Sequence, residues 1–181
     1  MRVDYVDYQT IFWYNNIMKR IINIGNKKKA TQQLEQFKNK QYESVDLEFT
    51  NVHLTTINVL IGYKFFVKNS LFARSSMLWE AMQPIGDKGR HNYHGLEPNE
   101  IVDALANLTN PHLIYESYYG RYVIVVLGND KYPFIMMIIE LNAGLTNNRN
   151  ANINKLVTIY PKSDLDKTLK KILDNKIVYK K

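Results

Sequence analysis

The sequence predicts an α+β fold: a helix, then a four-stranded antiparallel meander and a terminal helix, with an N-terminal helical region. Strand-like apolar runs separated by turn residues fill much of the second half. Helical spacing of apolar residues precedes that region. Hydrophobic residues make up 45% of the 181 residues, and 13 Tyr and 7 Phe suit a β-rich core. We therefore expect a basic helical region at 1–50 and an α+β domain at 51–181.

The N-terminal region is predicted to be helical and strongly basic. Apolar residues recur at helical spacing from Ile11 to Ile22, Gly25 then interrupts the pattern, and a polar helix is expected over about Thr31 to Tyr42. The segment 19–40 carries seven Lys or Arg residues against one Glu, most of the net charge of +7. Such a segment is usually a solvated face, and it becomes a nucleic-acid contact where it adjoins a site.

The middle of the chain has a less regular pattern. Thr56–Phe66 is rich in β-branched and aromatic residues, which favours a strand. Leu71–Met82 has apolar residues at helical spacing and is predicted to be a helix. Pro84–Tyr93 is polar and is predicted to be a loop.

The second half alternates strands and turns between two helices. Pro98 in the first turn opens a helix that ends at Asn110, before Pro111. Ser163 is expected to cap the final helix, and Ile177–Tyr179 to add a short strand. An Asn-rich loop is expected at Ala143–Asn152. The hairpin turns are expected at Tyr119–Gly120 and Gly128–Asp130, and the strands at His112–Ser117, Arg121–Leu127, Phe134–Asn142 and Lys155–Tyr160.

Composition excludes several kinds of chemistry and favours one kind of partner. The chain has no cysteine, so disulfides, thiol nucleophiles and Cys-based zinc sites are excluded. Met1–Thr10 contains two Asp and no apolar core segment, so no secretory signal is predicted, and we expect a cytoplasmic protein. The longest apolar run, Pro133–Ile139, is too short to cross a bilayer. The net charge of +7 favours nucleic acid ahead of an anionic membrane as partner.

Five ordered phrases of the second half carry a family resemblance. They are GRHNYHGL at 89–96, LTNPHLIYES at 108–117, RYVIVVL at 121–127, PFIMMIIEL at 133–141 and NKLVTIYPKS at 154–163. Their order and spacing resemble the phage MuF-type C-terminal nuclease domain of the barnase–EndoU–colicin–RelE-like superfamily. The resemblance is clearest over 89–181 and does not cover residues 1–50.

The resemblance implies a toxin-like, metal-independent ribonuclease derived from a phage or mobile element, in which a ribose 2′-hydroxyl attacks the adjacent phosphate. No cofactor is implied. The implied partners are RNA, with tRNA as one candidate, and a cognate immunity or antitoxin protein, without a membrane. The implied location is the cytoplasm of a bacterial host, reached by phage or by secretion. Two alternatives are a catalytically inactive phage accessory or inhibitor protein that binds nucleic acid or protein, and a structural or packaging protein of the virion.

Five residues are the candidate catalytic groups. His94 leads, because a histidine titrates near neutrality and Gly95 permits close backbone approach; the alternative is a histidine that only shapes its loop. Glu140 interrupts an apolar strand and is either a general base or a surface residue. Alternation places Asn154, Thr158 and Tyr160 on one strand face with Leu156, and Lys155, Val157 and Ile159 on an opposite, core-facing side.

The candidate substrate-binding residues are cations, hydroxyls and one further histidine near the same motifs. A hairpin end is a suitable place to present Ser117 and Arg121 to a phosphate, although Ser117 is also explained by turn chemistry. The full set is Arg90, His91, Ser117, Arg121, Lys155 and Lys162. His91 and Arg90 could equally be solvated loop residues.

Overall fold

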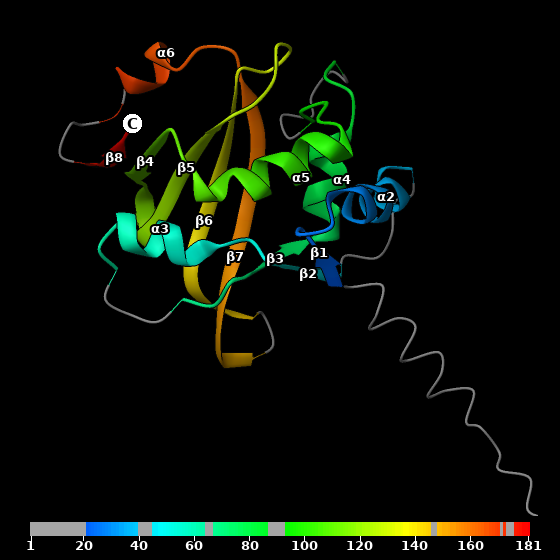
Figure 1. Ribbon diagram of the computed structural model, residues 1–181, viewed down its shortest axis with the longest axis horizontal. Coiled ribbons are helices and arrows are strands. Elements are labelled where there is room, and N and C mark those ends of the chain that lie inside the picture. Colours follow the sequence, from blue (N-terminus) through cyan, green and yellow to red (C-terminus); the bar gives the residue numbers. More distant parts are fainter. Residues whose placement is uncertain are drawn as a thin grey trace, which may run out of the picture.

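The structure, a computed structural model, describes residues 21–39, 45–63, 67–86, 93–145, 148–170, 172 and 176–181. Within these ranges eight strands form one mixed sheet in the order β1-β2-β3-β7-β6-β5-β4-β8 (Figure 1). The protein is α+β, but the predicted fold class is wrong, because the sheet is not limited to a four-stranded meander. Four further strands extend it on both sides.

The predicted meander forms the middle of the sheet. The strands β4 (Leu113–Glu116), β5 (Arg121–Leu127), β6 (Phe134–Leu145) and β7 (Asn148–Lys162) pair antiparallel in that order. The loop expected at 143–152 is instead the far end of the β6–β7 hairpin, where Ala143 pairs with Ile153. Asparagine disfavours strands, but the two long strands continue each other's hydrogen-bond ladder and override that preference.

The strands outside the meander come from both ends of the described chain. The strand β8 (Ile177–Lys180) pairs with β4 and matches the short last strand that was expected. On the other side lie β1 (Ile21–Asn23), β2 (Asp46–Thr50) and β3 (Ser70–Arg74). The strand β3 joins the meander by pairing parallel to β7, with Phe72 opposite Lys155. The amphipathic stripe expected from Ile11 lies mostly outside the described residues.

One helix follows each of the three N-terminal strands. These helices are α2 (Lys27–Lys38), α3 (Leu54–Leu60) and α4 (Ser75–Met82). The strand expected at Thr56–Phe66 is wrong, because Leu54 and Ile57, three residues apart, are buried on one side of a helical turn. The helix expected at Leu71–Met82 forms only in its second part. Leu71 and Ala73 alternate into the core as part of β3.

The helix α5 (Pro98–Ala106) confirms the prediction for the start of the second half. Glu97 and Glu100 form a reciprocal capping box at its N-terminus, with Pro98 in the first turn. A short 3-10 turn, η1 (Asn107–Thr109), follows α5. The terminal helix α6 (Asp166–Leu169) begins three residues after Ser163, so the prediction that Ser163 caps it is wrong. The Asp166 amide donates instead to the Asp164 Oδ1 at 2.8 Å.

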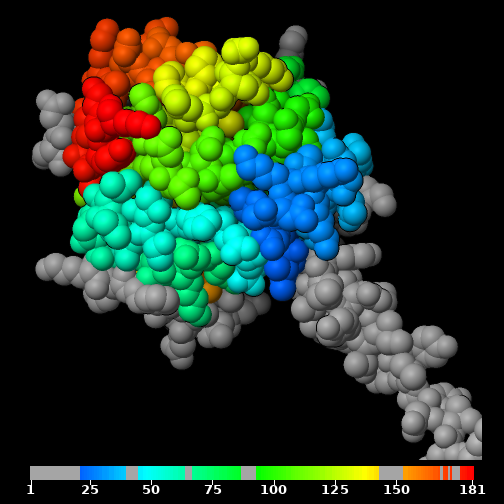
Figure 2. Space-filling model, in the orientation of Figure 1, coloured from blue at the N-terminus to red at the C-terminus, as the bar shows by residue number. Residues whose placement is uncertain are grey.

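The helices α2 to α5 cover one face of the sheet and enclose the larger core (Figure 1). Ile124, Met137, Ile139 and Ile159 point into this core from the central strands, each fully buried. Figure 2 shows this side, where α3 and α2 and the green segment that holds α5 form a continuous surface. In the described ranges no helix has the length and apolar character needed to cross a bilayer.

The other face of the sheet carries a smaller apolar cluster. Leu113, Val123, Val125 and Met136 form its base, and Leu165 near α6 covers it. This cluster occupies only part of the face. Polar side chains of β5, β6 and β7 continue beyond it, and we call this side the polar face.

Candidate functional site

A β-bulge in β7 determines which polar residues share the polar face. Ile138 pairs with Thr158 but Ile139 pairs with Leu156, so Val157 is an extra residue in β7. Leu156 and Ile159 consequently both point into the larger core. The prediction that Asn154, Leu156, Thr158 and Tyr160 share one face is therefore wrong, because the bulge reverses the alternation between them.

After the bulge, Thr158, Tyr160 and Lys162 alternate on the polar face. Tyr160 packs against the smaller apolar cluster, where it is half-buried. Thr158 is also half-buried, in a row of paired residues that runs through Ile138 and Val123 to Tyr115. The C-terminal part of β7 thus presents a hydroxyl, a phenol and an ammonium group along one line.

His94 is held beside this line by the backbone around it. The Gly95 amide donates to the Gln83 carbonyl at 2.8 Å, and the Leu96 amide donates to the Ala81 carbonyl at 3.0 Å. These bonds attach the histidine segment to the C-terminal end of α4. Gly95 has a φ of +65°, a conformation that residues with a Cβ rarely adopt. The glycine is therefore required for this path of the chain.

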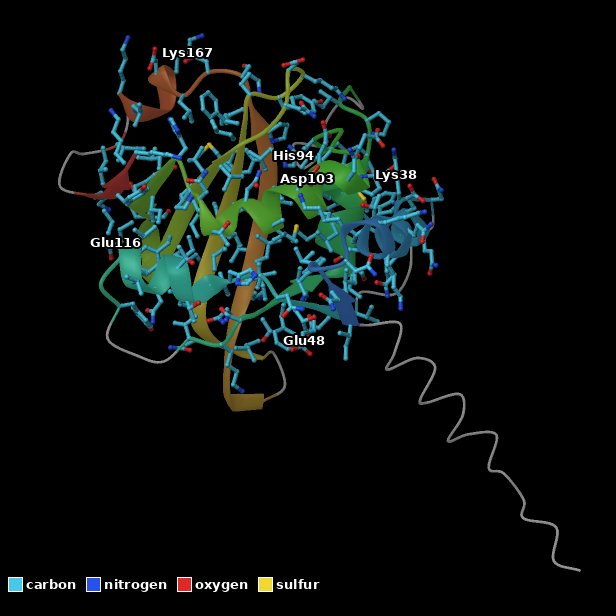
Figure 3. The ribbon with its side chains drawn as sticks, in the orientation of Figure 1. Lys38, Glu48, His94, Asp103, Glu116 and Lys167 are labelled. Atoms are coloured by element: carbon cyan, nitrogen blue, oxygen red, sulfur yellow. The ribbon has the colours of Figure 1, made fainter. Side chains whose placement is uncertain are left out.

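His94, Tyr160 and Lys162 form a compact cluster. The rings of His94 and Tyr160 lie 5.7 Å apart between centroids at an interplanar angle of 41°. The Lys162 Nζ lies 5.6 Å from the centre of the Tyr160 ring. Figure 3 shows His94 near the upper part of β7. His94 belongs to the first phrase of the family resemblance and Tyr160 to the last, and the fold brings these two residues into contact.

The surroundings of the cluster shift two pKa values in useful directions. Burial lowers the pKa of His94 below its ordinary 6.5, and nearby Lys162 lowers it further, while Glu80 opposes the shift. The imidazole is therefore neutral at neutral pH and can accept a proton. Burial raises the pKa of Tyr160, so its phenol stays protonated and can donate. The pair holds one acceptor and one donor of protons side by side.

Two residues of this neighbourhood were not anticipated from the sequence. Burial, together with Tyr160, raises the pKa of Tyr115 to about 12, which places the Tyr115 phenol near the cluster. Glu80 belongs to α4 and acts on His94 through its charge. Tyr115 lies within the LTNPHLIYES phrase, and alternation along the strand from Leu113 could have shown which face of the sheet it occupies. No feature of the sequence indicated that Glu80 would lie near His94.

A second polar row crosses the same face farther along the strands. Arg121 of β5 pairs with Glu140 of β6, and Glu140 pairs with Lys155 of β7. The Arg121 Nε donates to the Glu140 Oε2 at 3.2 Å, with each side chain about one third exposed. Glu140 shares its face with Met136 and Ile138, as alternation predicted. At about 3.3 Å per residue, this row lies roughly 13 Å along β5 from the level of Tyr160.

Asn154 has a different environment from the other predicted catalytic residues. Its side chain is 1% exposed and donates to the carbonyls of Lys68 and Ser70, at 2.9 and 3.0 Å. Its Oδ1 accepts from the Asn142 amide at 3.3 Å. All three contacts are with backbone groups, so the Asn154 amide connects β7 to the beginning of β3. The structure does not bring it to the His94 cluster.

The remaining predicted residues are dispersed. Ser117 ends the β4 hairpin arm, where its amide donates to the Arg121 carbonyl at 2.7 Å. Ser117, Arg121 and Lys155 are therefore distant from Tyr160, whereas Lys162 adjoins it. Arg90 and His91 lie outside the described residues.

A separate cavity of about 290 Å³ lies on the helix-covered side, between α5 and the β5–β6 turn. Its polar groups bind one another: Lys27 pairs with Asp103, and the Asn129 amide donates to Glu100 at 2.7 Å. The cavity shares no lining residue with the His94 cluster, and we assign it no role. Among the described residues, no three His, Asp or Glu side chains gather in a way that could hold a metal ion.

Comparison with known proteins identifies one family. Residues 86–181, more than half of the chain, match the family described as the phage MuF C-terminal domain. No curated protein and no solved structure shows significant similarity to the chain. The matched range contains the meander, both flanking helices and all members of the His94–Tyr160–Lys162 cluster.

Proposed function

The chain belongs to the phage MuF C-terminal domain family, and we propose that it is a metal-independent ribonuclease of the barnase–EndoU–colicin–RelE-like kind. The observation that carries this proposal is the contact between His94 and Tyr160 with Lys162 beside it. Cleavage of RNA through its own 2′-hydroxyl needs a base, an acid and positive charge at the phosphate. The cluster offers one group for each task.

His94 acts as the general base in this proposal. Its neutral imidazole takes the proton of the 2′-hydroxyl while the 2′-oxygen forms a bond to the adjacent phosphorus. The bond from phosphorus to the 5′-oxygen breaks, which leaves a 2′,3′-cyclic phosphate. A histidine whose pKa is lowered is suited to this step, because it is unprotonated before substrate arrives.

Tyr160 and its neighbours on β7 serve the rest of the step. The Tyr160 phenol donates its proton to the departing 5′-oxygen, which becomes a 5′-hydroxyl. Lys162 and the Thr158 hydroxyl interact with the charge that develops on the phosphate oxygens. Of the ion pairs in the described part of the chain, none involves Lys162, so no carboxylate there neutralises its charge.

The proposed partner is RNA, and the proposed site of action is the cytoplasm of a bacterial host. The chain has a net charge of +7, which favours binding to a polyanion. A nuclease of this kind would be toxic to the cell that makes it, so a protein inhibitor would accompany it. The inhibitor would have to cover the His94 cluster to be effective.

The test is cleavage of total cellular RNA by the purified full chain in EDTA, with end-group analysis of the products. We expect 2′,3′-cyclic phosphate and 5′-hydroxyl ends. His94→Gln keeps a polar side chain of similar reach but cannot act as a base, so the rate should fall by about 10²- to 10⁴-fold. Lys27→Gln is the control, because it removes a cation that pairs with Asp103 at a cavity sharing no lining residue with the cluster.

Two other outcomes would replace the proposal. RNA that stays intact but binds in a salt-dependent manner would indicate a catalytically inactive nucleic-acid-binding protein. Intact RNA without measurable binding would favour a protein-binding or virion role. Equal loss of activity in His94→Gln and Lys27→Gln would show that the cluster is not the catalytic centre.

A further inference from the structure

The turn between β4 and β5 exposes two adjacent tyrosines. Tyr118 is 76% exposed and Tyr119 is 91% exposed, which makes Tyr119 the most exposed of the large hydrophobic residues that the structure describes. Buried tyrosines contribute to cores, but these two contribute almost nothing to packing. Exposed aromatic side chains grouped in this way typically mark a binding surface.

The backbone of the turn makes Tyr119 an unfavourable choice for stability. Tyr119 has a φ of 63° and a ψ of 32°, in the left-handed region, and Gly120 follows with a φ of 68°. Two consecutive residues with positive φ are typical of tight hairpin turns in which Asn or Asp precedes Gly. A tyrosine there is strained, because its Cβ disfavours the left-handed conformation. Strain of this kind is often associated with function.

Two cations lie beside this turn. The Lys176 Nζ lies 4.9 Å from the centre of the Tyr118 ring, and Arg121 follows Gly120 directly. Lys176 precedes β8, which pairs with β4, whereas Lys180 pairs with Leu113 at the opposite end of β4. Glu116 and Glu140 are the nearby acids, and Glu140 is paired with Arg121. Aromatic rings with lysines beside them fit nucleobases attached to phosphates.

We propose that Tyr118 and Tyr119 form a stacking platform for the bases of a single-stranded RNA that extends from the His94 cluster. This inference rests on the proposed function for the identity of the ligand. The platform adjoins the Arg121–Glu140 row, roughly 13 Å along β5 from the level of Tyr160. Because Tyr160 lies on β7, two strand spacings of about 4.8 Å separate it from β5 as well, so the two points are roughly 16 Å apart, which is about five stacked nucleotides at ~3.4 Å each. Figure 3 shows Glu116, which ends β4 just before the turn, well apart from His94.

The platform and the cluster therefore have separate tasks. The platform contacts bases away from the bond that is cut, and stacking accepts any base, so it adds affinity without sequence preference. A dinucleotide that occupies the cluster is too short to reach it. The platform should consequently affect only longer RNA.

The experiment measures binding without cleavage. Fluorescence anisotropy would follow 2′-O-methyl RNA, which lacks the attacking hydroxyl, as a dinucleotide and as an octanucleotide. We expect Tyr119→Asn to weaken octanucleotide binding by about tenfold, equivalent to about 1.4 kcal/mol, in the range of a single aromatic stack. Dinucleotide binding should not change. Tyr118→Ala should behave in the same way.

Tyr119→Asn is informative because it should not destabilise the protein. Asparagine tolerates positive φ, so the denaturation midpoint should stay the same or rise. An abasic octanucleotide distinguishes stacking from charge, since its affinity should not respond to either tyrosine variant. Unchanged octanucleotide binding in both variants would overturn the platform, even if the wild-type protein cleaves RNA. Tenfold weakening in a protein that cleaves nothing would support the platform and reject only the ribonuclease proposal.

A protein partner is the alternative occupant of this surface. If neither oligonucleotide binds to the wild-type chain at low salt, the platform does not bind RNA. The proposal is then rejected in favour of a protein contact. Binding that is lost equally for the abasic and the normal octanucleotide would also reject it, because that result would implicate charge rather than stacking.

Discussion

The two ends of β7, on either side of its bulge, hold polar side chains in different surroundings. Before the bulge, Asn154 is buried, and its side chain forms three hydrogen bonds with backbone groups. After the bulge, Thr158, Tyr160 and Lys162 lie half-buried on the polar face beside His94. The first end connects two strands of the sheet, and the second end presents reactive groups.

A polar residue in a family motif can therefore stabilise the fold or belong to the candidate site. Asn154 and Tyr160 belong to one phrase of ten residues, 154–163, yet their contacts are unlike. One extra residue in the strand separates them onto different faces. Mutations before the bulge should therefore lower stability, and mutations after the bulge should lower activity.

Of the variants that compare the two ends of β7, Tyr160→Phe should lower the cleavage rate most. The variant keeps the ring that packs on His94 and the apolar cluster but removes the phenolic proton. We expect the rate of RNA cleavage to fall by about 100-fold, as is typical when a general acid is lost. Measurement would combine the cleavage rate with a urea denaturation curve, whose midpoint should change little. A full loss of stability with retained cleavage per folded molecule would contradict this role.

The next effect is on stability in Asn154→Ala. Removal of the amide leaves the Lys68 and Ser70 carbonyls without a buried donor, which should lower the free energy of unfolding by roughly 2–3 kcal/mol. Chemical denaturation measures the change. Thr158→Val is the matched control on the other side of the bulge. It should lose activity while its unfolding free energy changes by less than about 1 kcal/mol.

A smaller effect is expected on the titration of His94, followed by NMR of the imidazole. Lys162 helps to lower the pKa of His94, so Lys162→Gln should raise that pKa. Glu80 opposes the lowering, so Glu80→Gln should move the pKa further down. In the proposed mechanism the base form of His94 is the active form, so the acidic limb of the pH–rate profile should move to higher pH in Lys162→Gln and to lower pH in Glu80→Gln. Shifts in the same direction for both variants would exclude this electrostatic account.

The smallest effect is expected at the Arg121–Glu140 pair. Both side chains are about one third exposed, so solvent screens their attraction, and such pairs contribute about 0–1 kcal/mol. Glu140→Gln should therefore change the free energy of unfolding by less than about 1 kcal/mol, and cleavage by only a few-fold. A decrease in cleavage as large as that of Tyr160→Phe would move the catalytic centre toward Glu140.

The meander and the helix before it could be predicted from the sequence because their signals are local. The apolar runs of β5 and β6, the glycines of the turns and Pro98 near the start of α5 each act over a few residues. Before that region, the same reasoning found α2 and the second part of the α4 prediction, but it missed the strands β1, β2 and β3. There the short strands β1 and β3 carry little periodicity and become strands through pairing with distant partners.

The candidate site divides in the same way. The His94 motif and the Tyr160 strand were visible in the sequence, and Gly95 marked a special backbone conformation beside His94. Their contact was not visible, because it requires α4, whose C-terminal carbonyls hold the Gly95 and Leu96 amides. Glu80 acts on His94 from that helix and could not be recognised before the helix was placed.

Local sequence features predicted the order of the meander and the kinds of side chain on each of its strands, and they exclude cysteine chemistry. These features follow from turn residues, alternation and composition, which are properties of neighbouring residues. The contact between His94 and Tyr160 and the burial of Asn154 depend on the folded sheet. The bulge at Val157 is set by pairing with β6, and it sends Asn154 into the fold and Tyr160 to the site. Pairing between distant segments is a property of the whole sheet, and a local pattern does not contain it.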